Sequence, residues 1–317
     1  MVIARISRAL VVVVMMATVL STYAQGTEPG ERASVVVTTE VLGAVVSQVV
    51  GDAADVSVLM ESGADPHTWQ PSARDGEAIF GADLIVANGL DLEEGLVDVL
   101  EQARAEGVAK FAATDHITVR EFDADDHDEG HVDEAGDQAD DDGDAHEQGP
   151  GDPHFWLDPA AMADVVAALA VTLSGAGIDV DARADEMLDE LDALDAEIGE
   201  ILAAIPDERR TLVTGHESLG YLADRYGLEV VGTVIPGLTT SGEPSARDLA
   251  ELTARIRETG ASAVFAEIGT PQAVAQAVAD ETGAVVVELR LAQLPEDGRY
   301  ASLMRELATT IAGALAP

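Results

Sequence analysis

The sequence predicts an α/β protein with two lobes, each with a parallel sheet flanked by helices, joined by a single long linker helix. Short β-branched runs alternate with helical stretches along residues 34–178, and the same alternation returns along residues 207–317. Between the two series, residues 179–206 carry apolar side chains at helical spacing over a length that spans a small domain. A chain of 317 residues is also long enough for two lobes.

The first 24 residues are typical of a secretory signal peptide. An apolar run from Ala9 to Leu20 follows two arginines, and small residues lead to Ala24, where we expect cleavage. The run is short for a bilayer span, although an uncut segment would serve as an anchor. The chain has no cysteine, which excludes disulfides, thiolate metal ligands and a lipid-bearing cysteine. We therefore predict an exported protein, periplasmic or associated with the cell surface, with a polar linker at residues 25–33.

The first lobe is predicted from strands at 34–38, 54–60 and 83–87 and from helices at 41–50 and 73–80. Ser72, with Asp75 three residues later, is a start signal for the second helix. Helices between the strands imply parallel pairing.

Residues 115–151 interrupt this lobe with an acidic, histidine-containing stretch in which Arg120 is the only basic residue. We predict a disordered loop, because the stretch has too few apolar residues to form a core. Its histidines are either weak, exchangeable metal contacts or solvated side chains: His116, His127, His131 and His146.

Order is expected to resume at Asp158, which can cap a helix that starts at Pro159 and runs to about Leu173. After the long helix, the second lobe repeats the alternation of strands and helices. We expect its strands at 211–214, 229–234, 262–266 and 284–289, and its helices at 217–226, 245–259, 271–282 and 299–315. Two such lobes leave a cleft between them.

Two short segments of the chain repeat one motif. Asp65-Pro-His67-Thr-Trp69 and Asp152-Pro-His154-Phe-Trp156 share the pattern Asp-Pro-His-x-Trp, and they contain the only two tryptophans. A third histidine, His216, follows a predicted strand and precedes a helix, as His67 does. Because ligands of open parallel sheets bind beyond the carboxyl ends of the strands, we expect all three histidines to face the cleft.

Three imidazoles are a donor set for a borderline cation. Zinc takes such nitrogen ligands in tetrahedral sites, whereas magnesium and calcium prefer oxygen, and manganese is less suited. A single histidine after a strand is more often a structural, hydrogen-bonded side chain. The repeat and the shared topology favour a metal site at His67, His154 and His216.

The charge of the chain is strongly negative, with 60 acidic and 17 basic side chains and a formal net charge of -43. Such a field repels nucleic acid and concentrates cations near the surface. It is also a means of staying soluble in a salty habitat, and the two interpretations are compatible.

The motifs together resemble the zinc and manganese solute-binding proteins of ABC importers. The similarity rests on residues 63–72, the acidic loop, residues 152–159, the stretch from Gly215 to Gly227, and Val264 to Glu267. It implies two lobes joined by a rigid helix, a metal between them, and delivery to a membrane permease and its ATPase. His67, His154 and His216 take the family's first three ligand places, and a histidine at the third place resembles the zinc branch.

One position departs from the family pattern. Members usually supply an aspartate after the last strand, whereas the aligned residue here is Ala292. The fourth place then falls to water or to a carboxylate such as Glu267, which is also suited to orient a histidine instead.

The function predicted from these features is capture of Zn²⁺, with Mn²⁺ less favoured, by a monomeric extracytoplasmic subunit of an importer. Two other classes remain open. Three histidines and an open zinc position also outline a hydrolase, although no His-Glu-x-x-His helix occurs. A periplasmic zinc chaperone or adhesin would use the same ligands.

Overall fold

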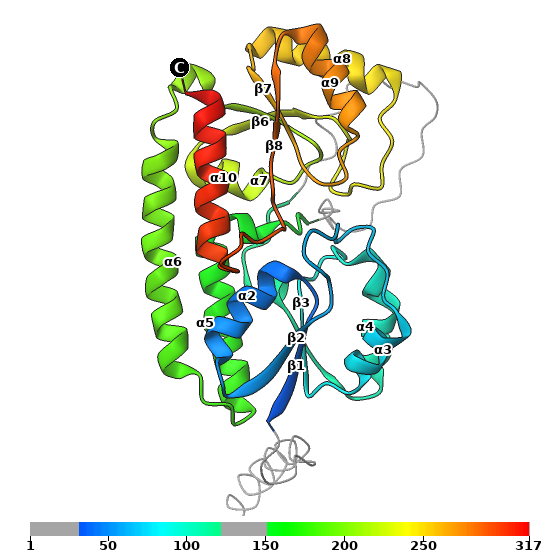
Figure 1. Cartoon of the computed structure of the whole chain (residues 1–317), viewed down its shortest axis with the longest axis vertical. Coiled ribbons are helices and arrows are strands. Elements are labelled where there is room, and N and C mark those ends of the chain that lie inside the picture. The colour runs from blue at the N-terminus through cyan, green and yellow to red at the C-terminus, as the bar shows by residue number, and fades with distance from the viewer. Residues whose placement is uncertain (1–31, 122–150, 317) are drawn as a thin grey trace, which may run out of the picture.

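The computed structural model describes residues 32–121 and 151–316, which form two α/β lobes stacked along the long axis of the molecule (Figure 1). Each lobe has a four-stranded parallel sheet with helices packed on it. The predicted fold class is therefore confirmed. The predicted signal peptide, nearly all of the linker, and the loop histidines His127, His131 and His146 lie outside the described residues.

The N-terminal sheet has the strand order β2-β1-β3-β4. The elements of this lobe are β1 (Ala33–Val37), α2 (Glu40–Val50), β2 (Ala54–Val58), α3 (Ala73–Phe80), β3 (Leu84–Ala87), α4 (Val97–Ala105), β4 (Ala109–Ala112) and α5 (Pro159–Gly175). Val35 and Val37 pack with α2 and α5 on one face, and Val36 packs with α3 and α4 on the other. This alternation is the period of two expected of a strand.

Two elements of this lobe, α4 and β4, were not predicted from the sequence. β4 reads Ala-Lys-Phe-Ala, so its pattern is too short and too polar to signal a strand. The predicted helix starts do occur. Ser72 and Asp75 form a capping box at α3, and Asp158 accepts a hydrogen bond from the Ala160 N–H (2.8 Å) at α5.

The C-terminal sheet repeats the same relative order, β6-β5-β7-β8. Its elements are β5 (Thr211–Thr214), α7 (Gly220–Tyr226), β6 (Glu229–Thr233), α8 (Ala246–Thr259), β7 (Ala263–Ala266), α9 (Gln272–Thr282) and β8 (Val285–Glu288). Val213 and Val264 face the core under α8 and α9, whereas Leu212 and Phe265 face the opposite core.

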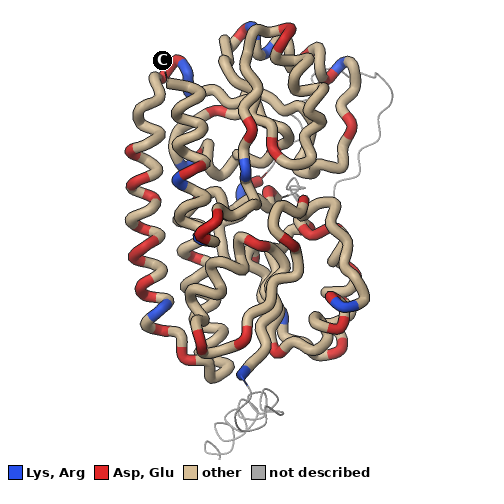
Figure 2. The backbone as a smooth tube through the Cα atoms, in the orientation of Figure 1, with Lys and Arg blue, Asp and Glu red and all other residues tan. Residues whose placement is uncertain are grey.

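Two long helices run beside both lobes, α6 (Asp181–Leu202) and α10 (Tyr300–Leu315) (Figure 1). α6 buries one stripe of apolar side chains against α5, α2 and α10, and acidic residues line its outer side (Figure 2). α10 returns to the first lobe, where the Tyr300 hydroxyl donates to the Trp156 carbonyl (2.7 Å). The largest hydrophobic cluster therefore continues from one lobe into the other.

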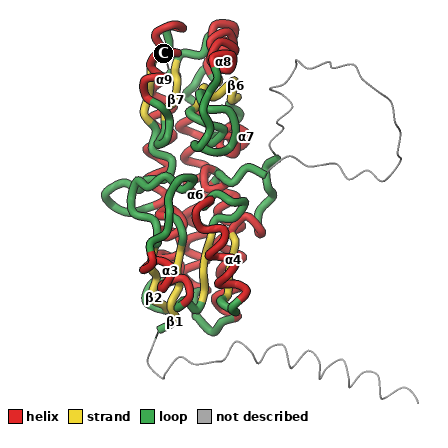
Figure 3. Tube along the Cα trace, turned by 90° about the vertical axis from the view of Figure 1, so that its right-hand side faces the viewer, coloured by secondary structure: helices red, strands yellow, loops and turns green. Residues whose placement is uncertain are grey.

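Loops gather at the junction of the lobes (Figure 3). They follow the carboxyl ends of the strands, and they include the segments after β2, β5, β7 and β8. In both sheets the first and third strands are neighbours, so the direction of strand addition reverses between them. Such a reversal opens a crevice at the strand ends, which is where ligands bind in open α/β sheets.

Candidate metal centre

Three buried histidines meet at the junction of the lobes. The Nε2 atom of His154 lies 3.3 Å from Nε2 of His67 and 3.1 Å from Nε2 of His216. Donor nitrogens lie about 3.3 Å apart when zinc–nitrogen bonds of about 2.0–2.1 Å point to the corners of a tetrahedron. Within the described part of the chain, these three side chains form the group of ligand atoms that could hold a metal ion.

Each histidine is placed by the end of a secondary-structure element. His216 lies two residues after β5, and His67 lies in the loop between β2 and α3. His154 directly precedes a 3₁₀ turn, Phe155–Leu157, that leads into α5. Two ligands therefore come from the first lobe and one from the second.

Carboxylates fix the ring orientation of two of these histidines. His154 Nδ1 lies 2.8 Å from Asp152 Oδ1, and His216 Nδ1 lies 2.8 Å from Glu267 Oε1. An ionised carboxylate only accepts hydrogen bonds, so Nδ1 carries the proton and Nε2 presents a bare lone pair. Two such lone pairs facing each other at 3.1 Å repel unless a cation lies between them.

Two of the histidines, His67 and His154, are held neutral by burial. Burial lowers the pKa of His67 to about 3, with a further lowering by the neighbouring His154 and His216. Burial also lowers the pKa of His154, although Asp152 opposes that shift. Neutral imidazole is the form that binds a metal, so His67 and His154 need lose no proton at pH 7.

The repeated Asp-Pro-His-x-Trp motif has a structural reason. Asp65 Oδ1 accepts a hydrogen bond from the His67 N–H (3.1 Å), and Asp152 Oδ1 accepts one from the His154 N–H (2.9 Å). In each copy the aspartate thus holds a turn that presents the histidine two residues later. The tryptophan of the second copy, Trp156, donates from Nε1 to the carbonyl of Leu291 (2.9 Å).

Glu267 follows β7 directly and lies beside His216 because β5 and β7 are paired neighbours. Besides His216 Nδ1, it accepts hydrogen bonds from the His216 N–H (2.8 Å) and the Ser218 hydroxyl (2.9 Å). A Cβ on Gly215 would lie 2.7 Å from Glu267 Oε1 and 2.0 Å from Thr270 Oγ1. Glycine at 215 is therefore required for the close approach of Glu267, which acts here as the orienting partner of His216.

Ala292, where the resemblance to the family led us to expect an aspartate, borders the three histidines. A small cavity of about 20 Å³ is lined by the three histidines together with Asp65, Glu267 and Ala292. The methyl side chain of Ala292 has no donor atom, so this position supplies no ligand to the metal centre.

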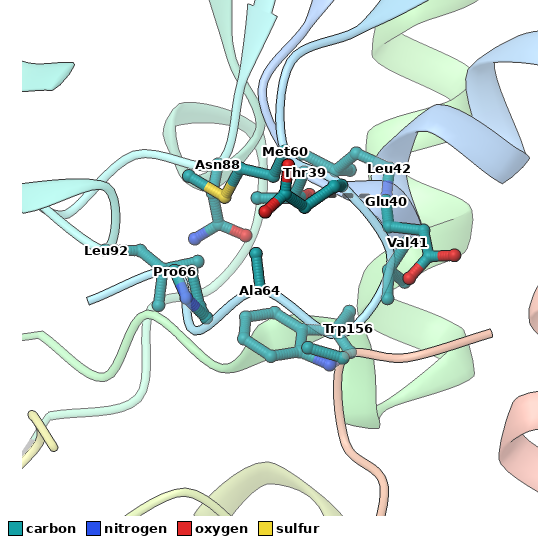
Figure 4. Close-up of a pocket in the computed structure, with 12 residues that line it drawn as sticks. Thr39, Glu40, Val41, Leu42, Met60, Ala64, Pro66, Asn88, Leu92 and Trp156 are labelled. Carbon is teal, nitrogen blue, oxygen red and sulfur yellow. Dashed lines mark hydrogen bonds between the residues drawn. The ribbon is translucent and has the colours of Figure 1, made fainter. Parts of the chain in front are cut away.

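A second small cavity is lined by Ala64 and Pro66 of the loop that carries His67 (Figure 4). The Trp156 indole forms one wall opposite Met60 and Thr39, and Pro66 and Ala64 lie between them. Its lining is almost entirely apolar, so it supports the packing of the loop rather than a ligand.

His116 does not join the centre. It ends a 3₁₀ turn, Ala113–His116, and its ring stacks on Phe111 with the ring centroids 4.4 Å apart. The predicted loop begins at residue 115, whereas the structure describes the chain as far as Glu121. Glu121 forms an isolated antiparallel β-bridge with Gly151.

Sequence reasoning did not identify the carboxylates around the first-lobe histidines. Asp152 was noted only as part of the motif, although the same Asp-Pro pattern could have indicated that it binds the ring of His154. Arg120 Nη1 lies 3.6 Å from Asp152 Oδ2, and Arg120 Nε donates to Asp224 of α7 (2.8 Å), which links this carboxylate to the second lobe. Glu94 Oε1 lies 3.7 Å from His67 Nδ1 and is more exposed.

The fold and the histidine cluster define a two-lobed α/β solute-binding protein. The sequence model of the family described as "Zinc-uptake complex component A periplasmic" matches residues 35–314. The chain belongs to this family, which confirms the resemblance seen in the sequence. Its members are metal-binding transport components and not enzymes.

The chain is also similar in sequence to proteins named for binding zinc or manganese. The zinc-binding protein TroA of Treponema pallidum is 31% identical over 226 residues, which cover 70% of this chain and 66% of TroA. The zinc-binding lipoprotein AdcA of Streptococcus pneumoniae TIGR4 is 31% identical over 74% of this chain. The chain spans about half of AdcA, since the match covers 45% of its length. The manganese-binding lipoprotein MntA of Halalkalibacterium halodurans is 26% identical over 81% of this chain and 78% of MntA.

Solved structures agree with the fold. The periplasmic zinc-binding protein TroA from Treponema pallidum superposes with a TM-score of 0.75 at 28% identity, over 90% of this chain and all of that one. Within the described residues, no helix is long and apolar enough to cross a membrane.

Proposed function

We propose that this chain is the extracytoplasmic binding subunit of an ABC importer and that it captures Zn²⁺ with His67, His154 and His216. The observation that carries the proposal is the convergence of Nε2 lone pairs. Asp152 and Glu267 accept hydrogen bonds from the Nδ1–H groups of His154 and His216, so the bare Nε2 atoms of these two rings, 3.1 Å apart, are placed to share a cation.

The donor set supports zinc over manganese. Three imidazole nitrogens suit zinc, whereas carboxylate and water oxygens suit manganese. The two carboxylates that line the histidine cavity already accept hydrogen bonds, three at Glu267 and two at Asp65. Curated relatives include proteins named for zinc and one named for manganese, so the choice rests on these ligands.

The family description of a zinc-uptake complex supports delivery of the metal to a permease and its ATPase. We propose that the mature chain is an exported monomer, released after cleavage near Ala24, with lobes 34–178 and 207–317 joined by the helix at 179–206. The acidic loop then serves to attract cations toward the cleft, and His127, His131 and His146 are weak contacts at most.

Metal analysis and calorimetric zinc titration of residues 25–317 test this function. We expect one zinc per chain and a loss of tight binding in His216→Ala, because two ligands do not close a zinc site. His116→Ala is the matched control, since this histidine is exposed and stacked on Phe111 outside the cluster. Unchanged affinity in His216→Ala would overturn the ligand assignment.

Delivery is tested separately by zinc uptake. Cells that carry the cognate permease and ATPase should lose high-affinity uptake when this chain is deleted and regain it with the wild-type chain but not with His216→Ala. Full uptake without the chain would favour a chaperone or adhesin.

A further inference from the structure

The described residues supply the metal centre with three donors, whereas zinc takes four ligands in tetrahedral sites. The two carboxylates that line the same small cavity are already engaged. Asp65 accepts from the His67 N–H with one oxygen and from the Thr240 hydroxyl with the other (2.7 Å), and both oxygens of Glu267 are taken. Among the described residues, this cavity therefore has no carboxylate without hydrogen bonds to act as the fourth ligand.

A larger cavity lies next to the cavity of the three histidines, on the side of Ala292. This cavity, called here the interlobe cleft, has a volume of about 360 Å³ and is lined by residues of the loops after β7 and β8 and by Gly63 and Ala64 of the first lobe. It shares Glu267, Ile268, Leu291 and Ala292 with the cavity of the three histidines. Because Ala292 ends in a methyl group, it leaves room between the metal centre and the cleft.

The wall of the interlobe cleft carries one basic residue, Arg290, and two acidic residues, Glu267 and Glu288. Arg290 lines it together with the neutral side chains of Thr270, Gln272 and Gln293. Arg290 is exposed, and among the described residues it forms no hydrogen bond or ion pair with a carboxylate, Glu288 on the same wall included. A guanidinium group presents a planar fork of donors that fits a carboxylate.

We propose that the protein binds its metal together with a small dicarboxylate or tricarboxylate that occupies the interlobe cleft. One carboxylate of this molecule is the fourth metal ligand on the Ala292 side, and a second pairs with Arg290. The cleft is of a size that fits small molecules, whose pockets measure about 300–1,000 Å³. The inference rests on the proposed function, since it requires the metal at the three histidines.

Cobalt(II) bound to the mature chain provides the test, because its visible absorption reports a change of ligand. The metal-loaded protein is titrated with succinate and, separately, with acetate. We expect both to shift the cobalt bands and succinate to act at about fivefold lower concentration, because its second carboxylate reaches Arg290. Succinate without a spectral change would overturn the proposal.

Three variants separate the parts of the inference. Ala292→Asp fills the fourth place from the protein, so it should bind cobalt and no longer respond to succinate. Arg290→Gln should respond to succinate only as weakly as to acetate. Arg104→Gln, an exposed arginine of α4 outside the cleft, should behave as the wild type.

The outcomes distinguish this inference from the proposed function. A chain that binds neither zinc nor cobalt refutes the metal site itself. A chain that binds the metal but ignores succinate, or an Ala292→Asp variant that still responds, refutes only the carboxylate ligand.

Discussion

The replacement Glu267→Gln tests whether a carboxylate tunes the metal centre. Glutamine keeps an oxygen that can accept from the N–H and Nδ1–H of His216, both at 2.8 Å, and an amide that can meet the Ser218 hydroxyl. The shape of the site is therefore retained and the negative charge is lost. That charge makes the imidazole a stronger donor and favours the Nδ1–H tautomer.

Loss of an orienting partner of this kind lowers metal affinity by about 10–100-fold, or about 1.4–2.7 kcal/mol. Competition against a chromophoric zinc chelator at pH 7.5 measures the change. Glu94→Gln is the matched control, because Glu94 lies 3.7 Å from His67 Nδ1 and its side chain is 43% exposed. Solvent screening should keep that effect well below tenfold. The reasoning is refuted if Glu267→Gln binds zinc as the wild type does, or if both variants lose affinity equally.

Three further predictions concern protonation, packing and motion. The pKa of His67 is lowered to about 3 in the folded, metal-free chain. Between about pH 6.5 and pH 3 the unfolded chain therefore binds more protons than the folded chain. Urea unfolding should show that the free energy of unfolding falls as the pH decreases below 6.5, by up to about 1.4 kcal/mol per pH unit from this residue. The slope should be smaller in His67→Gln, and equal slopes would contradict the lowered pKa of His67. Gly215→Ala should weaken zinc binding and destabilise the fold by about 1–3 kcal/mol, because its Cβ would lie 2.0 Å from Thr270 Oγ1, whereas Gly76→Ala on open α3 should do neither. Because the hydrophobic cluster that contains α6 and α10 continues through both lobes, crystal structures with and without zinc should differ in loops rather than by a rotation of tens of degrees between lobes.

The alternation of strands and helices was readable from the sequence because most elements carry a clear period. The buried stripe of α6, which includes Met187, Leu191 and Ile198, is one such pattern, and the caps at Ser72 and Asp158 are local signals. β4 was missed because it is short and contains Lys110. Nor did the sequence indicate that α10 would return to the first lobe, since its apolar pattern fits any neighbour.

The sequence by itself determined the residue types that matter for the metal centre. The duplicated Asp-Pro-His-x-Trp motif and the placement of His216 after a strand were sufficient to select three histidines, because side chains at strand ends share one edge of a parallel sheet. Only the tertiary structure decided which carboxylates accept hydrogen bonds from the histidine rings. Glu267 reaches His216 because β7 pairs with β5, and Ala292 borders the cleft because the chain after β8 crosses the junction. These contacts join residues far apart in the chain, so they depend on the pairing of strands and the packing of lobes, which no local pattern encodes.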